Sequence, residues 1–198
     1  MGKSRGRPRQ FDEDTVLSAA EGVFWLKGYD DTSLDDLASA MGMNRPSIYR
    51  AFGDKEALYL TVLLKYCGKM EAAFDETMAS DKGIKERLTY FLQAALDVYI
   101  EGDQPKGCMA MGTAITAAPH HPKIQEVLLE VVNGLEQKLI RQFNNAIASG
   151  QLPKGKEALG CAVMAQALLH SLSPRSRVGD SKDQLARMID CGVHLIVT

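Results

Sequence analysis

The sequence lacks the features that mark zinc knuckles, membrane spans and secreted proteins. No two of its four cysteines form a CxxC pair, which excludes a zinc knuckle. No stretch approaches the roughly 20 consecutive apolar residues of a membrane span, and no apolar run follows the basic N-terminus, so no signal peptide is expected. We therefore expect reduced thiols, no membrane partner and a cytoplasmic location.

Catalytic motifs are also missing. The chain has no HExxH, no GxSxG, no phosphate-binding loop and no paired histidine and carboxylate constellation. His120 and His121 are adjacent but have no fixed third ligand, so we predict no metal site. We predict neither an enzyme nor a bound cofactor. The alternatives are an all-helical enzyme, which no residue pattern supports, and an architectural DNA-binding protein without a ligand.

Charge is distributed unevenly along the chain. The formal net charge of −2 argues against unspecific binding to nucleic acid. The first ten residues nevertheless carry four basic side chains and no acid. A basic arm on an acidic body fits contacts with DNA phosphates, and a solvated tail fits the charge pattern equally well. Hydrophobic residues make up 45% of the chain, which is enough for a real core.

Strand patterns are absent, and helical spacing runs through the whole chain. No run alternates apolar and polar residues as a half-buried strand would, so we predict an all-α fold. The expected helices cover about 12–27, 33–41, 45–52, 55–76, 84–101, 108–118, 122–148, 156–172 and 181–197. The expected loops include 102–107, 149–153 and 173–176. The helix that begins at residue 55 is too long for a domain of about 50 residues, so we expect domains at 1–54 and 55–198.

The segment 32–58 contains two short helices joined by a tight turn. The first is capped by Ser33 with Asp36 or, equally well, by Thr32 with Asp35. Gly42 is placed to take the positive φ of the turn.

The second helix of this segment begins after Asn44, which is a good N-cap, and Pro46 is tolerated in the first turn. Ala38, Gly42 and Ile48 have the spacing with which two helices cross around a turn. This pattern predicts a helix-turn-helix, in which the second helix enters the DNA major groove.

The exposed residues of this motif differ in their chemistry. Arg45 at the start of the second helix can pair bidentately with guanine. Hydroxyl and amide side chains nearby suit phosphate oxygens, and Lys55 would add its charge to the free N–H groups of the next helix. Arg50 could face DNA or a carboxylate. The predicted DNA contacts are Arg5, Arg7, Arg9, Thr32, Ser33, Asn44, Arg45, Ser47, Tyr49, Arg50 and Lys55.

The second domain offers large apolar residues that could surround a cavity or form ordinary core. Cys108 follows Gly107 at an expected helix N-terminus, where a thiol gains reactivity. We interpret it as an electrophile or oxidant sensor, or as a small buried residue. The candidate ligand contacts are Phe74, Met78, Phe91, Cys108, Met111, Ile115, Phe143 and Met164. Small side chains near 160–172 and an apolar stripe on the last helix indicate a dimer face or, again, core.

The helix-turn-helix residues resemble the N-terminal signature of the TetR family of bacterial transcriptional repressors. The resemblance covers about residues 10–60. It rests on Gly28-Tyr29, Thr32-Ser33, Leu37-Ala38, Gly42-Met43, Ile48-Tyr49, Phe52 and Lys55-Glu56-Ala57-Leu58. Asn44-Arg45-Pro46 departs from the common Ser-x-Gly or Ser-x-Ala, so we expect an altered sequence preference.

The resemblance implies a repressor that acts as a homodimer on a palindromic double-stranded DNA operator. The last two helices would form the four-helix bundle of the dimer, and the larger domain would bind a small-molecule inducer. Inducer binding would move the two recognition helices away from the spacing of successive major grooves, about 34–36 Å. The basic arm resembles arms that enter a narrow minor groove.

Overall fold

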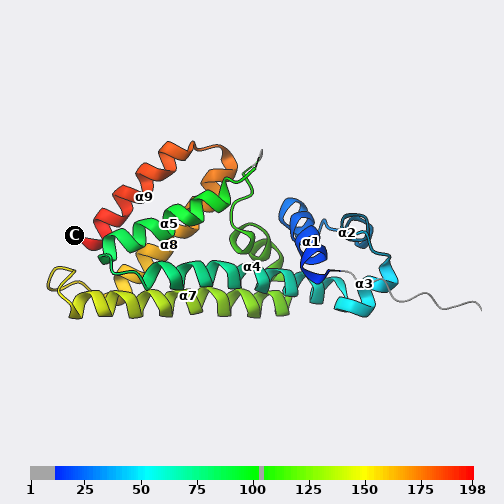
Figure 1. Ribbon diagram of the computed structural model, residues 1–198, viewed down its shortest axis with the longest axis horizontal. Coiled ribbons are helices and arrows are strands. Elements are labelled where there is room, and N and C mark those ends of the chain that lie inside the picture. Colours follow the sequence, from blue (N-terminus) through cyan, green and yellow to red (C-terminus); the bar gives the residue numbers. More distant parts are fainter. Residues whose placement is uncertain (1–11, 103–104) are drawn as a thin grey trace, which may run out of the picture. The chain divides into compact units, whose positions relative to one another are not determined.

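The computed structural model describes residues 12–102 and 105–198, and this part of the chain is helical without a strand (Figure 1). The all-α prediction is confirmed. The predicted contacts Arg5, Arg7 and Arg9 lie outside the described residues. No helix in the described ranges is long and apolar enough to cross a membrane. The helices are α1 (Glu13–Lys27), α2 (Leu34–Met41), α3 (Arg45–Phe52), α4 (Lys55–Met78), α5 (Ile84–Tyr99), α6 (Ile115–Ala117), α7 (Pro122–Ala148), α8 (Ala158–Val178) and α9 (Lys182–Val197).

The chain divides into two compact units, Met1–Val62 and Leu63–Thr198. We call them the first unit and the second unit. Helix α4 begins in the first unit and continues into the second.

Local capping fixes the helices of the first unit. Ser33 accepts a hydrogen bond from the Asp36 N–H, and the Asp36 carboxylate accepts one from the Ser33 N–H, which makes a complete capping box. Gly42 ends α2 in the left-handed region with φ 61°. The Asn44 side chain accepts a hydrogen bond from the Ser47 N–H at the start of α3. The bounds of both short helices therefore follow from these caps.

An aromatic cluster forms the core of the first unit. The rings of Phe24 and Tyr59 meet edge to face with centroids 5.0 Å apart, and Tyr29 packs on Tyr59 at the same distance. Leu37 from α2 and Ile48 from α3 are fully buried in this unit. Burial of Ile48 anchors α3, and most of its other residues are exposed.

The second unit is a helical bundle. Helices α5, α8 and α9 pack against one another, and α7 packs along α8 (Figure 1). Its core includes the fully buried Phe143, Leu172, Leu185 and Ile189. Val193 and Ile196 are buried as well. Of the five residues of the apolar stripe expected on the last helix, four are therefore buried in this core: Leu185, Ile189, Val193 and Ile196, but not Met188.

The prediction of a loop at 173–176 is wrong. Helix α8 continues through Pro174 to Val178. Ser173 and Ser176 are both buried, and the Ser176 hydroxyl donates to the Ser173 carbonyl. The Cys108 N–H donates to Ser173 Oγ at 2.8 Å, so tertiary contacts stabilise a segment in which proline disfavours the helix.

The helix expected at 108–118 is also less regular than predicted. It consists of a π-helical segment at Ala110–Ala114, the single turn α6, and a 3₁₀ turn at Ala118–His120. Gly107 precedes it with φ 68°, and a Cβ there would lie 2.8 Å from Ser173 Oγ. Close packing on α8 therefore shapes this segment, and helix propensity does not.

Candidate DNA interface and ligand cavity

Helix α3 presents one buried side and one polar side. Ile48 is fully buried, whereas Tyr49 is 49% exposed. Asn44, Arg45 and Arg50 are exposed, and Ser47 is partly exposed. The five predicted contacts on and beside α3 are therefore all at least partly accessible, with Ile48 on the buried side.

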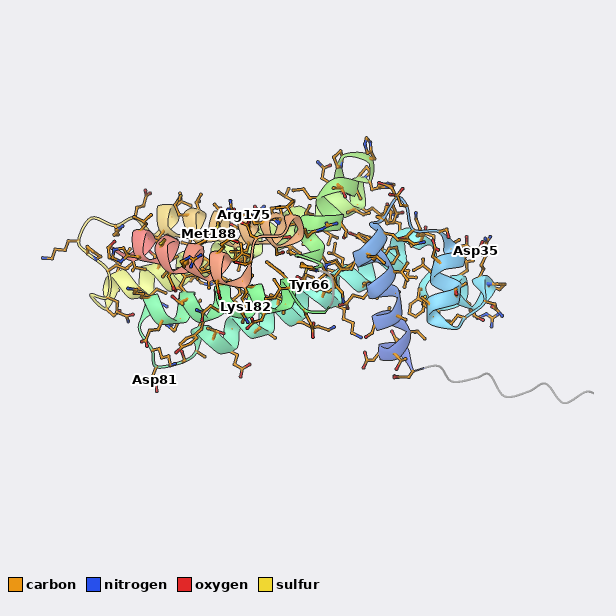
Figure 2. The ribbon with its side chains drawn as sticks, turned by 90° about the horizontal axis from the view of Figure 1, so that it is seen from above. Asp35, Tyr66, Asp81, Arg175, Lys182 and Met188 are labelled. Carbon is orange, nitrogen blue, oxygen red and sulfur yellow. The ribbon has the colours of Figure 1, made fainter. Side chains whose placement is uncertain are left out.

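Arg45 is held by Asp35 on α2. Its Nε donates to Asp35 Oδ1 at 2.7 Å, and its Nη2 donates to Asp35 Oδ2. The hydrogen bonds from Arg45 lower the pKa of the Asp35 carboxyl, and they raise the pKa of Arg45 in turn. Asp35, labelled in Figure 2, is exposed at the surface of the first unit. Arg45 is therefore paired bidentately with Asp35 at the surface.

A second ion pair braces α1 against α2. Lys27 Nζ lies 2.6 Å from Asp36 Oδ1, and the Ser33 hydroxyl donates to Asp36 Oδ2. The Lys27 hydrogen bond and those of Ser33 lower the pKa of Asp36. Ser33 remains exposed at the start of α2.

Thr32 and Lys55 bind the protein's own backbone. Thr32 is only 2% exposed, and its hydroxyl donates to the Gly28 carbonyl at 2.5 Å. Lys55 Nζ donates to the carbonyls of Tyr29 and Thr32 at 2.9 and 3.0 Å, and it lies 4.3 Å from the Tyr29 ring centroid. The structure thus gives both side chains a role in holding the turn between α1 and α2, which their spacing in the sequence did not indicate.

A cavity of about 300 Å³ lies within the second unit. Four of the eight predicted ligand contacts line it: Phe74, Phe91, Cys108 and Met111.

The other four predicted contacts are not brought to this cavity. Met78 and Phe143 are buried elsewhere in the core, and Ile115 and Met164 are 48% and 59% exposed. The physical reason is that successive side chains point in different directions around the axis of a helix, so only some apolar residues of each helix face the cavity.

Several cavity residues were not predicted from the sequence. Tyr66, Cys67 and Met70 precede Phe74 on α4, and Figure 2 shows Tyr66 inside the second unit. Their spacing of four to eight residues before Phe74 is the signal that could have placed them on the same face. The Tyr66 hydroxyl donates to Cys108 Sγ at 3.5 Å, which joins α4 to the residues just before the π-helical segment.

The titratable groups around the cavity interior are held uncharged by burial. Burial raises the pKa of the Tyr66 and Tyr99 phenols and raises the pKa of the Cys67 thiol to about 12. Burial lowers the pKa of His170. At neutral pH these four groups are therefore neutral, and they suit an apolar ligand.

Helices α8 and α9 also expose apolar side chains. Leu159, Val163 and Met164 on α8 and Leu195 on α9 are between 43% and 73% exposed. Cys191 on α9 is exposed as well. Exposed apolar residues gathered on neighbouring helices are typical of a surface that a partner covers.

Comparisons with known proteins agree with this geometry. Residues 16–62 match the family model of bacterial regulatory proteins, tetR family, and residues 85–191 match that of the tetracyclin repressor-like C-terminal domain. The chain is 29% identical over 195 residues to the HTH-type transcriptional repressor ComR of Escherichia coli K12, covering 98% of this chain and 92% of that protein.

Two further proteins show the same relationship. The HTH-type regulator YezE of Bacillus subtilis is 30% identical over 147 residues, or 74% of this chain and 76% of that protein. A cysteine mutant of the TetR family regulator CifR, solved with 26-base-pair operator DNA, superposes with a TM-score of 0.87 and 26% identity, covering 95% of this chain and 98% of that one. The chain therefore belongs to the TetR family of helix-turn-helix transcriptional regulators.

Proposed function

We propose that this protein is a transcriptional repressor that binds a palindromic operator as a homodimer and leaves it when a small molecule binds. The observation that carries the proposal is the polar, exposed side of α3, anchored from behind by the buried Ile48. The naming of ComR as a repressor and the operator complex of CifR support the same role.

The residues of α3 take different roles in this proposal. Arg45 reads a guanine edge in the major groove. Asn44, Ser47 and Tyr49 hold phosphate oxygens and fix the register of the helix. Arg50 adds a further phosphate contact from the same exposed side. Arg5, Arg7 and Arg9 in the basic arm would enter the adjacent minor groove.

Ser33 is the remaining predicted contact that stays accessible, since it is exposed at the start of α2. Thr32 and Lys55, the first residue of α4, contribute by holding the turn that precedes α2. The Lys55 ammonium has three N–H donors, and two of them bind the Tyr29 and Thr32 carbonyls. A contact with a DNA phosphate would use the third.

The homodimer forms through α8 and α9. Leu159, Val163 and Leu195 supply apolar area that is exposed in the single chain. A two-fold axis places the same surface of two copies together, and it gives two recognition helices for two half-sites one helical turn apart.

Release follows from binding in the cavity. Tyr66, Met70 and Phe74 of α4 form one of its walls, and the same helix begins in the first unit. A ligand that displaces α4 therefore acts on the helix that continues from the DNA-binding residues. The protein would then exist in two arrangements, one that binds the operator and one that does not. The ligand shifts the equilibrium between them by the difference in its affinity for the two.

A reactive electrophile is a second kind of inducer that the cavity allows. The Cys108 side chain lines the cavity, although it is only 8% exposed. A Michael acceptor that enters forms a bond from its β-carbon to Cys108 Sγ, and the thiol proton ends on the α-carbon of the adduct.

Fluorescence anisotropy with labelled upstream DNA tests the proposal. We expect tight binding to one palindromic site, weak binding to a random duplex of equal length, and release by a ligand that fills the cavity. Lys85→Ala, an exposed change on α5, serves as the control. Equal binding to all duplexes with no response to any ligand would indicate an architectural protein instead.

A further inference from the structure

The cavity lining includes three charged side chains, two of which are exposed to solvent. Glu71 on α4 and Glu130 on α7 line the cavity and are exposed, and Lys138 on α7 lines it next to Glu71. The interior groups Tyr66 and His170 are uncharged at neutral pH, as described above. A ligand therefore meets formal charge only at this rim, which we define as Glu71, Glu130 and Lys138.

The single cation of the rim is already neutralised. Lys138 Nζ lies 2.7 Å from Glu71 Oε1 and 2.6 Å from Asp75 Oδ2. Burial alone would lower the pKa of Lys138, but hydrogen bonds to Asp75 and Glu71 outweigh it and raise that pKa. Lys138 thus stays charged and satisfied, and an anionic ligand would have to displace two carboxylates to reach it.

Carboxylates outnumber cations among the charged residues that line the cavity or pair with its lining, although Asp75 itself lies outside the lining. Glu71, Asp75 and Glu130 against Lys138 amount to three negative charges and one positive charge, which leaves −2. The excess repels a ligand carboxylate or phosphate and attracts a ligand cation.

Aromatic rings stand next to these charges. Phe74 and Phe91 meet edge to face with centroids 4.9 Å apart, and both line the cavity. Lys138 Nζ lies 6.0 Å from the Phe74 centroid, so one ammonium group already occupies a position over that ring. The face of an aromatic ring attracts a cation.

From these observations we infer that the cavity selects a lipophilic cation, an alkyl or aryl body carrying one ammonium-type charge. The body packs among Phe74, Phe91 and Met111, and the charge lies at Glu71 and Glu130. The inference rests on the proposed ligand response and adds the chemical class of the inducer.

Three probes of similar size and different charge test the inference: phenylbutylammonium, phenylbutanol and phenylbutanoate. Isothermal titration of the full chain without DNA gives the affinity of each. Because the rim is exposed to solvent, we expect phenylbutylammonium to bind roughly three- to tenfold more tightly than the alcohol. The carboxylate should bind most weakly.

Variants of the rim separate charge from shape. The double change Glu71→Gln and Glu130→Gln should abolish the preference for the ammonium probe and leave the affinity for phenylbutanol within about twofold. Glu126→Gln, an exposed change on α7 outside the cavity lining, is the matched control and should preserve the preference. Circular dichroism confirms that each variant is folded.

Tightest binding of phenylbutanoate, equal binding of all three probes, or no binding of any would overturn the inference. So would an ammonium preference that survives the double change. Operator binding is measured separately, with no probe present. A protein that binds its operator but prefers the carboxylate would refute the ligand class and leave the proposed repressor role standing.

Discussion

The guanidinium of Arg45 on α3 is paired at two points with the carboxylate of Asp35 on α2. The two residues are ten positions apart, and the turn at Gly42 brings them together. The pair favours one rotamer of the side chain proposed to read guanine. The pair also means that DNA must replace or share the Asp35 carboxylate when it binds Arg45. A guanine edge offers two acceptors for this exchange and a phosphate oxygen offers one, so the pair favours contact with the base.

Asp35→Asn should weaken discrimination between DNA sequences. Without the carboxylate, Arg45 is free to pair with any phosphate, so binding to a random duplex should strengthen. The slope of log affinity against log salt for random DNA should steepen by about 0.9, the effect of one more phosphate contact. Anisotropy titrations over a series of salt concentrations measure the affinity for random DNA and its dependence on salt. An unchanged ratio of operator to random affinity would show that Asp35 plays no part in selection.

Arg45→Ala and Tyr49→Ala should have different consequences. Loss of Arg45 removes a base contact, so it should relax preference at one position of each half-site by about 1–3 kcal/mol. Loss of Tyr49 removes a phosphate contact and should lower the affinity for all duplexes by the same factor. Titration against operators with single base changes distinguishes the two patterns. Equal effects of Arg45→Ala on operator and random DNA would contradict the base-reading role.

Lys55→Ala should destabilise the first unit even without DNA. The ammonium group donates to the carbonyls of Tyr29 and Thr32 and lies over the Tyr29 ring. Loss of these contacts should lower the free energy of unfolding by about 1–3 kcal/mol. Urea unfolding followed by circular dichroism gives the value, with Lys85→Ala as the control. If Lys55→Ala weakens operator binding without changing stability, phosphate contact is the main role of the side chain.

Acid should destabilise the second unit partly through His170. Burial lowers the pKa of His170 in the folded chain below its ordinary value of about 6.5. The unfolded chain therefore binds a proton at His170 more readily than the folded chain does. As pH falls below about 6.5, this difference lowers the free energy of unfolding. His170→Asn should flatten the decline in unfolding free energy between about pH 6.5 and pH 5. The exposed change His120→Asn should leave that decline as in the unmodified chain.

Cys108→Ser should resist release by an electrophile. An α,β-unsaturated probe that enters the cavity alkylates the thiol of the unmodified chain, and the serine hydroxyl is too weak a nucleophile to replace it. Anisotropy of bound operator should fall with the probe for the unmodified chain and stay constant for the variant. Cys191→Ser serves as the control, because Cys191 is exposed and lies outside the cavity lining. Equal release of the Cys108 variant would rule out this cysteine as the sensor.

The all-α class, the bounds of α3 and α7 and the helix-turn-helix could all be predicted from the amino acids alone. The reason is that caps, glycine turns and helical spacing act over three or four residues, and such short-range preferences can be read without the fold. Ser33, Asn44 and Gly42 perform the roles that their positions indicated. The pattern of resemblance also placed the chain in its family.

Which distant side chains meet could not be predicted from the sequence and became visible in the folded chain. The tertiary structure paired Arg45 with Asp35, turned Lys55 toward the carbonyls of its own unit, and continued α8 through Pro174. It also placed Phe74 and Phe91 at a cavity while burying Phe143 elsewhere. Apolar side chains look alike in a sequence, and the rotation and packing of whole helices decide which of them face an opening and which fill the core.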